Sequence, residues 1–310
     1  MRFSEAVDAF LTAKETSTQA TTQVWYRYQF AAIGQWLASH GHDGSLVVAP
    51  ELIDRFLAEQ KRDGLKPATL NGRWRALCAL YNWLVMRRKL KADDNPMMLV
   101  DRPSVPKREP RHAALDEFMK LLDSIPRTGW VAMRDRLAIT TFMLTGLRVS
   151  ELVNLRLSDY DVTGMRIKIL SQKGGDSNQV PMLQAVCDAF IAYIYSKPEA
   201  HDDHVFISCD GAGNVRGVLT RNGMYQRLTV LCRKAGIERI NPHAFRHGLA
   251  MHLLNEAGAP TSLIQGILRH KSEATTKTFY ARWEIGGVSS QFVDKMSAVD
   301  AMVRGRQGRK

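Results

Sequence analysis

The sequence predicts a mainly α-helical protein with a small β-sheet, divided into two domains. Apolar residues recur at helical spacing along most of the chain, which is typical of amphipathic helices. A proline-rich basic segment interrupts this pattern near residue 101. Beyond that segment, one stretch alternates apolar and polar residues in the manner of a β-hairpin. The length of 310 residues leaves room for two separate hydrophobic cores.

Residues 1–101 are predicted to form a helical domain. Helices are expected within three stretches: "TTQVWYRYQFAAIGQWLASHG", "APELIDRFLAEQKRDG" and "KPATLNGRWRALCALYNWLVMRRK". In the first of them, Tyr28, Phe30, Ile33 and Trp36 follow one another at near-helical spacing. Aromatic stripes of this kind are more often core than a platform for a ligand, so we expect them to be buried.

The segment "DRPSVPKREPRHAAL" follows, and residues 102–112 of it form the expected interdomain linker. Its three prolines disfavour a regular helix. Its basic side chains are expected to be solvated, and the same side chains would also suit a phosphate backbone. These residues are Arg102, Lys107, Arg108 and Arg111. Their spacing does not separate the two alternatives.

Residues 113–310 are predicted to form the second domain, which includes a C-terminal tail. Most of this domain has helical periodicity, and the stretch "VTGMRIKILSQKGGDSNQVPM" predicts a hairpin with a glycine-rich turn. In the tail, the apolar spacing of "SSQFVDKMSAVDAMVRG" predicts a helix. That helix would dock either on a neighbouring protomer or on its own domain. Its apolar stripe consists of Phe292, Met296, Val299 and Met302.

The overall charge favours a polyanionic partner. Lys and Arg number 43 against 31 Asp and Glu, which gives a formal net charge of +12. Such an excess suits nucleic acid, because each phosphate that a cation neutralises releases a counterion. The four cysteines are widely separated, which disfavours a zinc site or a disulfide framework and fits a reducing cytoplasm. No stretch approaches the roughly 20 apolar residues of a membrane span, so we expect a cytoplasmic protein with no membrane partner.

Several basic and polar residues interrupt otherwise apolar helices of the second domain. Arg148 lies in the apolar run "LTGLRVSEL", so it must be paired or face a cleft, and Glu151 is the local alternative as its partner. His243 and Arg246 lie in "NPHAFRH", where Asn241 and Pro242 predict the start of a helix. The remaining members of the ordered set are Lys173 in the hairpin turn "QKGG", His270 in "LRHKS" and Tyr280 in "TTKTFY".

In this order the residues resemble the catalytic motifs of the tyrosine recombinases, also called phage integrases. The resemblance implies a helical core-binding (SAM-like) domain followed by a tyrosine-recombinase catalytic domain. It implies that Arg148 and Arg246 bind the scissile phosphate and that Tyr280 forms a 3′-phosphotyrosyl bond. It also implies that Lys173 protonates the 5′-oxygen, that His243 assists proton transfer and that His270 bonds the phosphate. His247 is expected to brace the fold instead.

Two positions depart from the family pattern. Arg269 stands where glycine usually precedes the second histidine, and the interval from His270 to Tyr280 is one residue longer than the usual spacing. The usual spacing would place Phe279 at the position of the nucleophile. Because phenylalanine has no hydroxyl group, Tyr280 remains the expected nucleophile.

The expected activity is site-specific recombination of DNA for integration, excision or resolution of a mobile element or replicon. Neither a metal nor another cofactor is expected, since "HDDH" at 201–204 is typical of an exposed turn and no nucleotide-binding loop is present. The implied partners are double-stranded DNA with specific recombination sites, a homo-tetramer on the synapsed sites and accessory DNA-bending proteins. The alternatives are a type IB topoisomerase-like enzyme and a DNA-binding protein of this fold that has lost catalysis.

Overall fold

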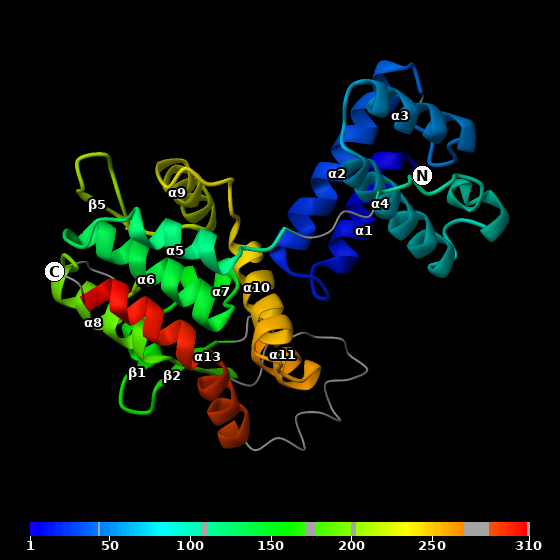
Figure 1. Ribbon diagram of the computed structural model, residues 1–310. Coiled ribbons are helices and arrows are strands. Elements are labelled where there is room, and N and C mark those ends of the chain that lie inside the picture. The colour runs from blue at the N-terminus through cyan, green and yellow to red at the C-terminus, as the bar shows by residue number, and fades with distance from the viewer. Residues whose placement is uncertain (43, 107–110, 171–177, 200–202, 270–284, 309–310) are drawn as a thin grey trace. The chain divides into compact units, whose positions relative to one another are not determined.

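The chain folds into two compact units, Met1–Arg108 and Glu109–Lys310, in the computed structural model shown in Figure 1. The structure describes residues 1–42, 44–106, 111–170, 178–199, 203–269 and 285–308. The boundary between the units lies within residues 102–112. No helix in these described ranges is both long enough and apolar enough to cross a membrane.

The first unit is a bundle of α-helices closed by two short 3-10 helices. Its elements are α1 (Phe3–Lys14), α2 (Ala20–Ser39), α3 (Pro50–Arg62), α4 (Pro67–Met86), η1 (Ala92–Asp94) and η2 (Pro96–Met98). The ring of Phe10 makes edge contacts with Phe30 and Trp83 in the middle of this core.

The predicted burial of the aromatic stripe on α2 is confirmed for most of its members. Phe30, Ile33 and Trp36 are buried. The prediction is wrong for Tyr28, whose exposed fraction is 64%. Tyr28 precedes Phe30 by two residues, which is about 200° around a helix, so its side chain leaves from the opposite face.

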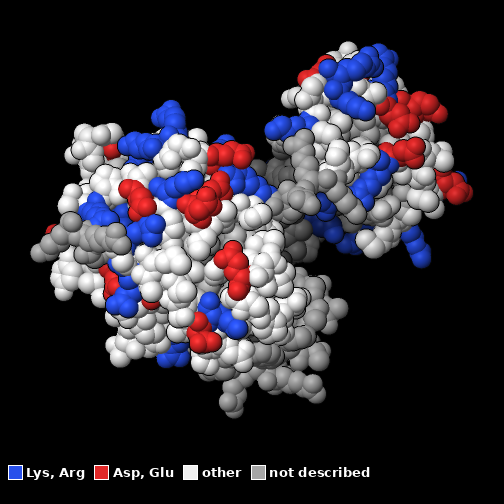
Figure 2. All heavy atoms as spheres, in the orientation of Figure 1, with Lys and Arg blue, Asp and Glu red and all other residues white. Residues whose placement is uncertain are grey.

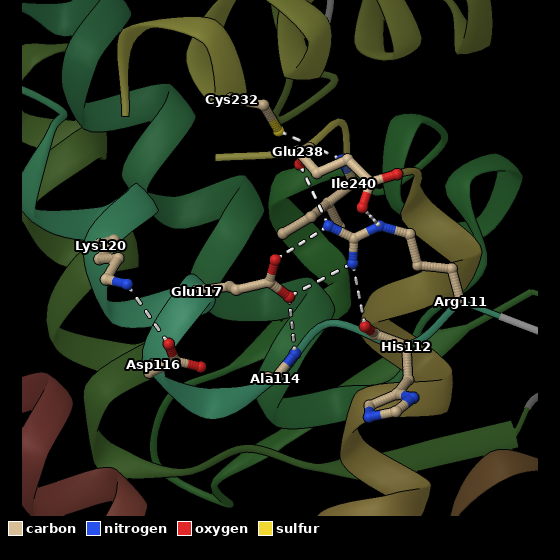
Figure 3. Close-up of polar contacts among 9 residues, drawn as sticks. All are labelled: Arg111, His112, Ala114, Asp116, Glu117, Lys120, Cys232, Glu238 and Ile240. Atoms are coloured by element: carbon tan, nitrogen blue, oxygen red, sulfur yellow. Dashed lines mark hydrogen bonds and ion pairs between the residues drawn. The ribbon is translucent and has the colours of Figure 1, made fainter. Parts of the chain in front are cut away.

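Both ends of the proline-rich segment are attached to neighbouring side chains. Arg102 donates a hydrogen bond from Nε to Oδ1 of Asn71, at 2.9 Å. Figure 3 shows Arg111 between the carboxylates of Glu117 and Glu238, with 2.9 Å between Arg111 Nη2 and Glu117 Oε1. The expectation of a solvated side chain is therefore wrong for Arg111, because its guanidinium group forms ion pairs with Glu117 and Glu238. Lys107 and Arg108 lie outside the described residues.

The second unit is mainly helical and also contains two antiparallel sheets. Its helices are α5 (Leu115–Asp123), α6 (Trp130–Thr145), α7 (Val149–Val153), η3 (Leu157–Asp159), α8 (Gln184–Ser196), α9 (Arg221–Lys234), α10 (Pro242–Met251), the π-helical η4 (His252–Glu256), α11 (Thr261–Leu268) and α13 (Ile285–Gly308). Its strands are β1 (Tyr160–Asp161), β2 (Arg166–Ile169), β3 (Asn178–Pro181), β4 (Ile207–Cys209) and β5 (Val215–Val218).

The predicted hairpin is confirmed as β2 and β3, which pair in the order β1-β2-β3. Ile167 lies opposite Val180, and both side chains are buried. The turn that joins these strands, with Lys173, lies outside the described residues. A second sheet, in which β4 pairs with β5, accompanies the predicted one.

Helix α6 lies at the centre of the second unit. Its residues from Arg134 to Thr145 are all buried, as expected of a helix that is covered on every side. Helices α8, α10 and α13 pack against it. Figure 1 shows α13, in red, beside α8 of the same unit.

The C-terminal helix α13 docks on its own domain, which was one of the two alternatives from the sequence. Phe292, Met296 and Val299 of the expected stripe are buried, and Val303 completes it in place of Met302, which is 46% exposed. Asp300 of this helix accepts a hydrogen bond from the backbone N–H of Ala185 at the start of α8, at 2.8 Å.

Close backbone approach at Gly248 holds α10 against the beginning of the second unit. The N–H of Ala113 donates to the carbonyl oxygen of Ala244, at 2.9 Å. A β-carbon added at Gly248 would overlap the carbonyl oxygen of Ala113. Glycine is therefore required here, and this packing positions the helix that carries His243 and Arg246.

We expect Gly248→Ala to lower the free energy of unfolding by about 1–3 kcal/mol, because the added methyl group displaces a backbone segment. Gly305→Ala is the matched control, since Gly305 lies in α13 with no atom within 4 Å of an added β-carbon. That control should raise stability by about 0.5–1 kcal/mol through helix propensity. Urea unfolding of both variants measures the difference, and equal effects would refute the packing explanation.

Candidate active site

Helix α10 begins as the sequence predicts. The side chain of Asn241 accepts a hydrogen bond from the N–H of Ala244 at 3.0 Å, and Pro242 occupies the first turn. His243 lies on the exposed surface of this first turn, while Arg246 is buried one turn later. The cap and the proline thus fix the residue at which α10 begins. They thereby place His243 in its first turn and Arg246 one turn later.

Arg246 is a buried cation whose hydrogen-bonding capacity is only partly used. Its side chain is 2% exposed, and Nη1 donates to the carbonyl oxygen of Gly146 at 2.6 Å. Its Nε and Nη2 atoms are buried and have no hydrogen-bond partner within the described part of the chain. Burial, together with the positive charges of Arg148 and Arg269, lowers the pKa of Arg246 to about 9. An oxyanion beside this guanidinium would supply the missing acceptors and compensate its charge.

The turn at Gly146 brings the acceptor for Arg246 into place. Gly146 ends α6 with a φ of +60°, a conformation that favours glycine. A β-carbon at this position would lie 2.8 Å from Leu268 Cδ2 and 3.2 Å from Leu249 Cδ2. The turn therefore packs directly against α10 and α11, and Arg148, two residues later, caps the start of α7.

Arg148 pairs with Glu151 and lies near Arg246 as well. It precedes α7, where its backbone N–H donates to Glu151 Oε2 and its Nη1 donates to Glu151 Oε1, both at 2.7 Å. Its Nη2 donates to the backbone carbonyl of Arg269 at 3.3 Å. The local Arg–Glu pair is present, yet the side chain is still 42% exposed. Pairing therefore orients this guanidinium while part of it stays accessible.

Arg269 adds a third guanidinium group to those of Arg246 and Arg148. The sequence motifs assign it no role. Its Nη2 lies 2.8 Å from Glu151 Oε2, and its own side chain is 8% exposed. Its φ is +51°, which costs an ordinary residue about 1–2 kcal/mol. A hydrogen bond between charged groups returns about 1.5–3 kcal/mol, which offsets that strain. The signal in the sequence was an arginine where the family usually has glycine.

Glu151 is held as a carboxylate by its neighbours. Burial raises the pKa of Glu151, but the charges of Arg269 and Arg148 and the backbone N–H of Arg148 outweigh burial and lower it below its ordinary value. The cluster thus contains one carboxylate and three guanidinium groups. The resulting excess of positive charge, next to a buried cation short of acceptors, is suited to binding a phosphate group.

His247 packs against His243 on α10. The two rings meet edge to face with centroids 4.6 Å apart. Burial, together with His243, Arg246 and His112, lowers the pKa of His247, which favours its neutral form. The bracing role expected for His247 stays a prediction, and its ring contact with His243 is the geometry that it would use.

Three of the six predicted site residues lie outside the described residues: Lys173, His270 and Tyr280. In the "HDDH" stretch the structure describes Asp203, whose Oδ1 accepts from Arg156 at 2.7 Å, and His204. Within the described ranges, no group of three or more His, Cys, Asp or Glu side chains is arranged to hold a metal ion.

Known proteins of one family match this chain. The sequence profile of the phage integrase family matches residues 112–284. The chain is 30% identical over 282 residues to tyrosine recombinase XerD of Yersinia pestis, covering 88% of this chain and 91% of that protein. It is 27% identical over 277 residues to tyrosine recombinase XerC of Xanthomonas campestris pv. campestris, covering 88% and 83%.

Solved structures share its fold. The integrase of transposon Tn1549, in complex with transposon right end DNA, aligns with a TM-score of 0.70 at 21% identity, covering 96% of this chain and 99% of that one. A lambda integrase tetramer bound to a Holliday junction aligns with a TM-score of 0.68 at 16% identity, covering 92% and 80%. The chain belongs to the phage integrase family. Within it, its class is the tyrosine recombinases, the class named in both relatives.

We expect Glu151→Gln to lower the free energy of unfolding by about 2 kcal/mol near pH 7, because two guanidinium groups lose a shared anion. The pKa of Glu151 is depressed in the folded state, so its contribution is present above its ordinary pKa of 4.5 and is lost as the pH falls through the folded value.

The difference between wild type and Glu151→Gln should therefore shrink as urea unfolding is repeated from about pH 7 down to about pH 3. Glu238→Gln is the control, because that side chain is 80% exposed and its pair with Arg111 should contribute less than about 1 kcal/mol. A Glu151→Gln difference that is independent of pH would contradict the ion-pair explanation.

Proposed function

We propose that this protein is a site-specific recombinase that cleaves and rejoins duplex DNA through a 3′-phosphotyrosyl intermediate. The observation that carries this proposal is the buried guanidinium of Arg246. Two of its nitrogen atoms have no partner in the described structure, and Arg148 adds positive charge beside it. The non-bridging oxygens of a phosphodiester would supply both the acceptors and the negative charge that this group lacks.

The proposed chemistry is a displacement at phosphorus. The hydroxyl oxygen of Tyr280 bonds to the scissile phosphorus as the bond from phosphorus to the 5′-oxygen breaks. The tyrosine loses its proton and the departing 5′-oxygen gains one. Arg148 and Arg246 bind the non-bridging oxygens, where negative charge accumulates in the transition state. The phosphotyrosyl ester conserves the bond energy, so a 5′-hydroxyl of another strand can reverse the reaction without a nucleotide cofactor.

The remaining assignments concern protons and hydrogen bonds. Lys173 donates the proton to the 5′-oxygen, His243 assists proton transfer and His270 bonds the phosphate. A phenol with an ordinary pKa near 10 is a weak nucleophile at neutral pH, so proton transfer through His243 and the positive charge around the phosphate must assist its deprotonation. The exposed position of His243 at the start of α10 supports its assignment, since a substrate can reach it there.

The proposed partner is double-stranded DNA carrying specific recombination sites, acted on by a homo-tetramer. The solved lambda integrase tetramer on a Holliday junction and the Tn1549 integrase with its transposon end support this choice. On the face shown in Figure 2, Lys and Arg are interspersed with Asp and Glu. Because the net charge is +12, we expect affinity to come from many separate phosphate contacts and to fall steeply with salt.

The biological outcome that we propose is integration, excision or resolution, with accessory DNA-bending proteins as further partners. The recombinase names of the XerD and XerC relatives favour this class over a topoisomerase-like enzyme. The four cysteines are free, which supports a site of action in the reducing cytoplasm. A requirement for two DNA sites in one reaction would separate a recombinase from a topoisomerase.

The decisive experiment is adduct mapping with Tyr280→Phe as the comparison. A duplex site is first selected from a random pool by binding to Tyr280→Phe, and a nicked suicide version is then incubated with both proteins. Wild type should form a covalent adduct that peptide mapping places on Tyr280. The variant should bind equally well and form none, because only the attacking oxygen is missing. An adduct on another residue, or one formed by Tyr280→Phe, would falsify the assignment.

We expect Arg246→Lys to reduce the single-turnover rate of adduct formation by at least about 100-fold while leaving DNA binding within about threefold. Lysine keeps a charge but loses the planar fork that binds two phosphate oxygens. Arg233→Lys, an exposed position on α9, is the matched control and should cleave at the wild-type rate. Near-normal cleavage by Arg246→Lys would mean that its guanidinium serves the fold alone.

A further inference from the structure

Arg269 occupies an unusual position at the end of α11. The helix ends at Leu268, and Arg269 follows in the left-handed conformation, with φ +51° and ψ +47°. Only glycine adopts this conformation without a steric penalty. The side chain then folds back, and its Nη1 donates to the carbonyl oxygen of Ile267 at 3.1 Å. The conformation therefore turns the guanidinium toward the body of the second unit.

Arg269, Glu151 and Arg148 form a closed ring of contacts. Arg269 Nη2 lies 2.8 Å from Glu151 Oε2, and Glu151 Oε1 lies 2.7 Å from Arg148 Nη1. Arg148 Nη2 returns to the backbone carbonyl oxygen of Arg269 at 3.3 Å. The ring thus links the start of α7 to the end of α11 through both the side chain and the backbone of Arg269.

This ring restrains a side chain that would otherwise be free to move. The side chain of Arg148 is 42% exposed, and a long arginine side chain loses considerable rotamer freedom when it is held in one geometry. Two fixed acceptors, one from Glu151 and one from Arg269, bind different terminal nitrogens of Arg148. Among the described residues, the other side-chain N–H groups of Arg148 have no protein acceptor and could bind an anion. Both terminal nitrogens of Arg269 donate to acceptors of the protein itself, Nη1 to the carbonyl oxygen of Ile267 and Nη2 to Glu151, so it acts through Glu151 and not by touching substrate.

We propose that Arg269 is a positioning residue, which clamps Glu151 and the end of α11 so that the guanidinium of Arg148 is preorganised for the scissile phosphate. This role rests on the proposed function for its effect on DNA cleavage. The clamp itself is a property of the protein without DNA. It also gives a role to an arginine at a position whose backbone conformation favours glycine.

The clamp is tested first without DNA, by nuclear magnetic resonance of protein labelled with ¹⁵N-arginine. Arg148→Lys identifies the Arg148 guanidinium signals by their loss. In wild type, the two terminal nitrogens of Arg148 should give distinct signals, because each donates to its own fixed acceptor. In Arg269→Gly they should merge through faster rotation, and Arg269→Lys should restore part of the separation. Unchanged Arg148 signals in Arg269→Gly would overturn the proposal whatever the protein does to DNA.

The reaction is tested next, by single-turnover adduct formation at saturating protein. Arg269→Gly should lower the rate about 10-fold with binding unchanged, since a misplaced phosphate-binding group slows the chemical step. Arg88→Gly is the matched control, because Arg88 also has a positive φ, of 54°, but lies exposed in the first unit. Both changes relieve the same backbone strain, and only Arg269→Gly should slow cleavage.

The outcomes separate this inference from the proposed function. Absence of any wild-type adduct would refute the recombinase proposal, while the Arg148 signals would still decide the clamp. Merged signals with an unchanged cleavage rate would overturn the positioning role. Equal slowing by Arg88→Gly and Arg269→Gly would overturn it too, because the effect would then come from the backbone.

Discussion

The buried charge of Arg246 is the constraint on which the rest of the site depends. Removing a cation from water is costly unless it gains partners, and among the described residues the carbonyl oxygen of Gly146 is the one acceptor that its guanidinium has. Helix α10 must therefore be held in place by other contacts. Its polar cap at Asn241 and its close approach to Ala113 through Gly248 provide them. The Nε and Nη2 atoms of Arg246, which have no partner among the described residues, cost stability, and they are the groups that the proposed phosphate contact would use.

The carboxylate of Glu151 offsets part of the positive charge of the arginine cluster, because it pairs with both Arg148 and Arg269. Three guanidinium groups close together repel one another, and two of them, those of Arg269 and Arg148, lower the pKa of Glu151. Its two oxygens are shared between Arg148 and Arg269. Pairing and anion binding are therefore compatible for Arg148, since the carboxylate orients one part of the guanidinium and leaves another part accessible. The Arg148–Glu151 pair expected from the sequence is present, and binding of the scissile phosphate by Arg148 stays a proposal.

Low sequence identity coexists with a shared fold because packing depends on apolar pattern and volume more than on particular residues. The Tn1549 integrase aligns over nearly the whole chain at 21% identity. In this protein the buried helix α6 collects the contacts of α8, α10 and α13. The buried apolar residues of this helix, such as Leu137, Phe142 and Leu144, form part of the scaffold. Arg269 lies outside that helix, at the end of α11, and belongs to the site that the scaffold carries.

The sequence by itself determined the features that depend on neighbours along the chain. Helical periodicity, the Asn241–Pro242 helix start and the alternation in the β2–β3 hairpin all arise from contacts a few residues apart, so they leave a readable pattern. The ordered motifs likewise identified Arg148 and Arg246 as candidates for binding phosphate.

Hydrogen bonds and ion pairs between residues far apart in the sequence could be seen only in the folded structure. Arg269 and Glu151 are separated by 118 positions, and Arg246 and Gly146 by 100. No periodicity or propensity encodes such a contact, because it exists only after α7, α10 and α11 have packed together. The same holds for Arg111. The composition of the linker predicts a solvated side chain, but in the folded unit Arg111 pairs with Glu117 and Glu238. Burial and ion pairing are properties of the packed unit. From the sequence, Arg269 is only a departure from the family motif, whereas in the folded unit it is buried and paired with Glu151.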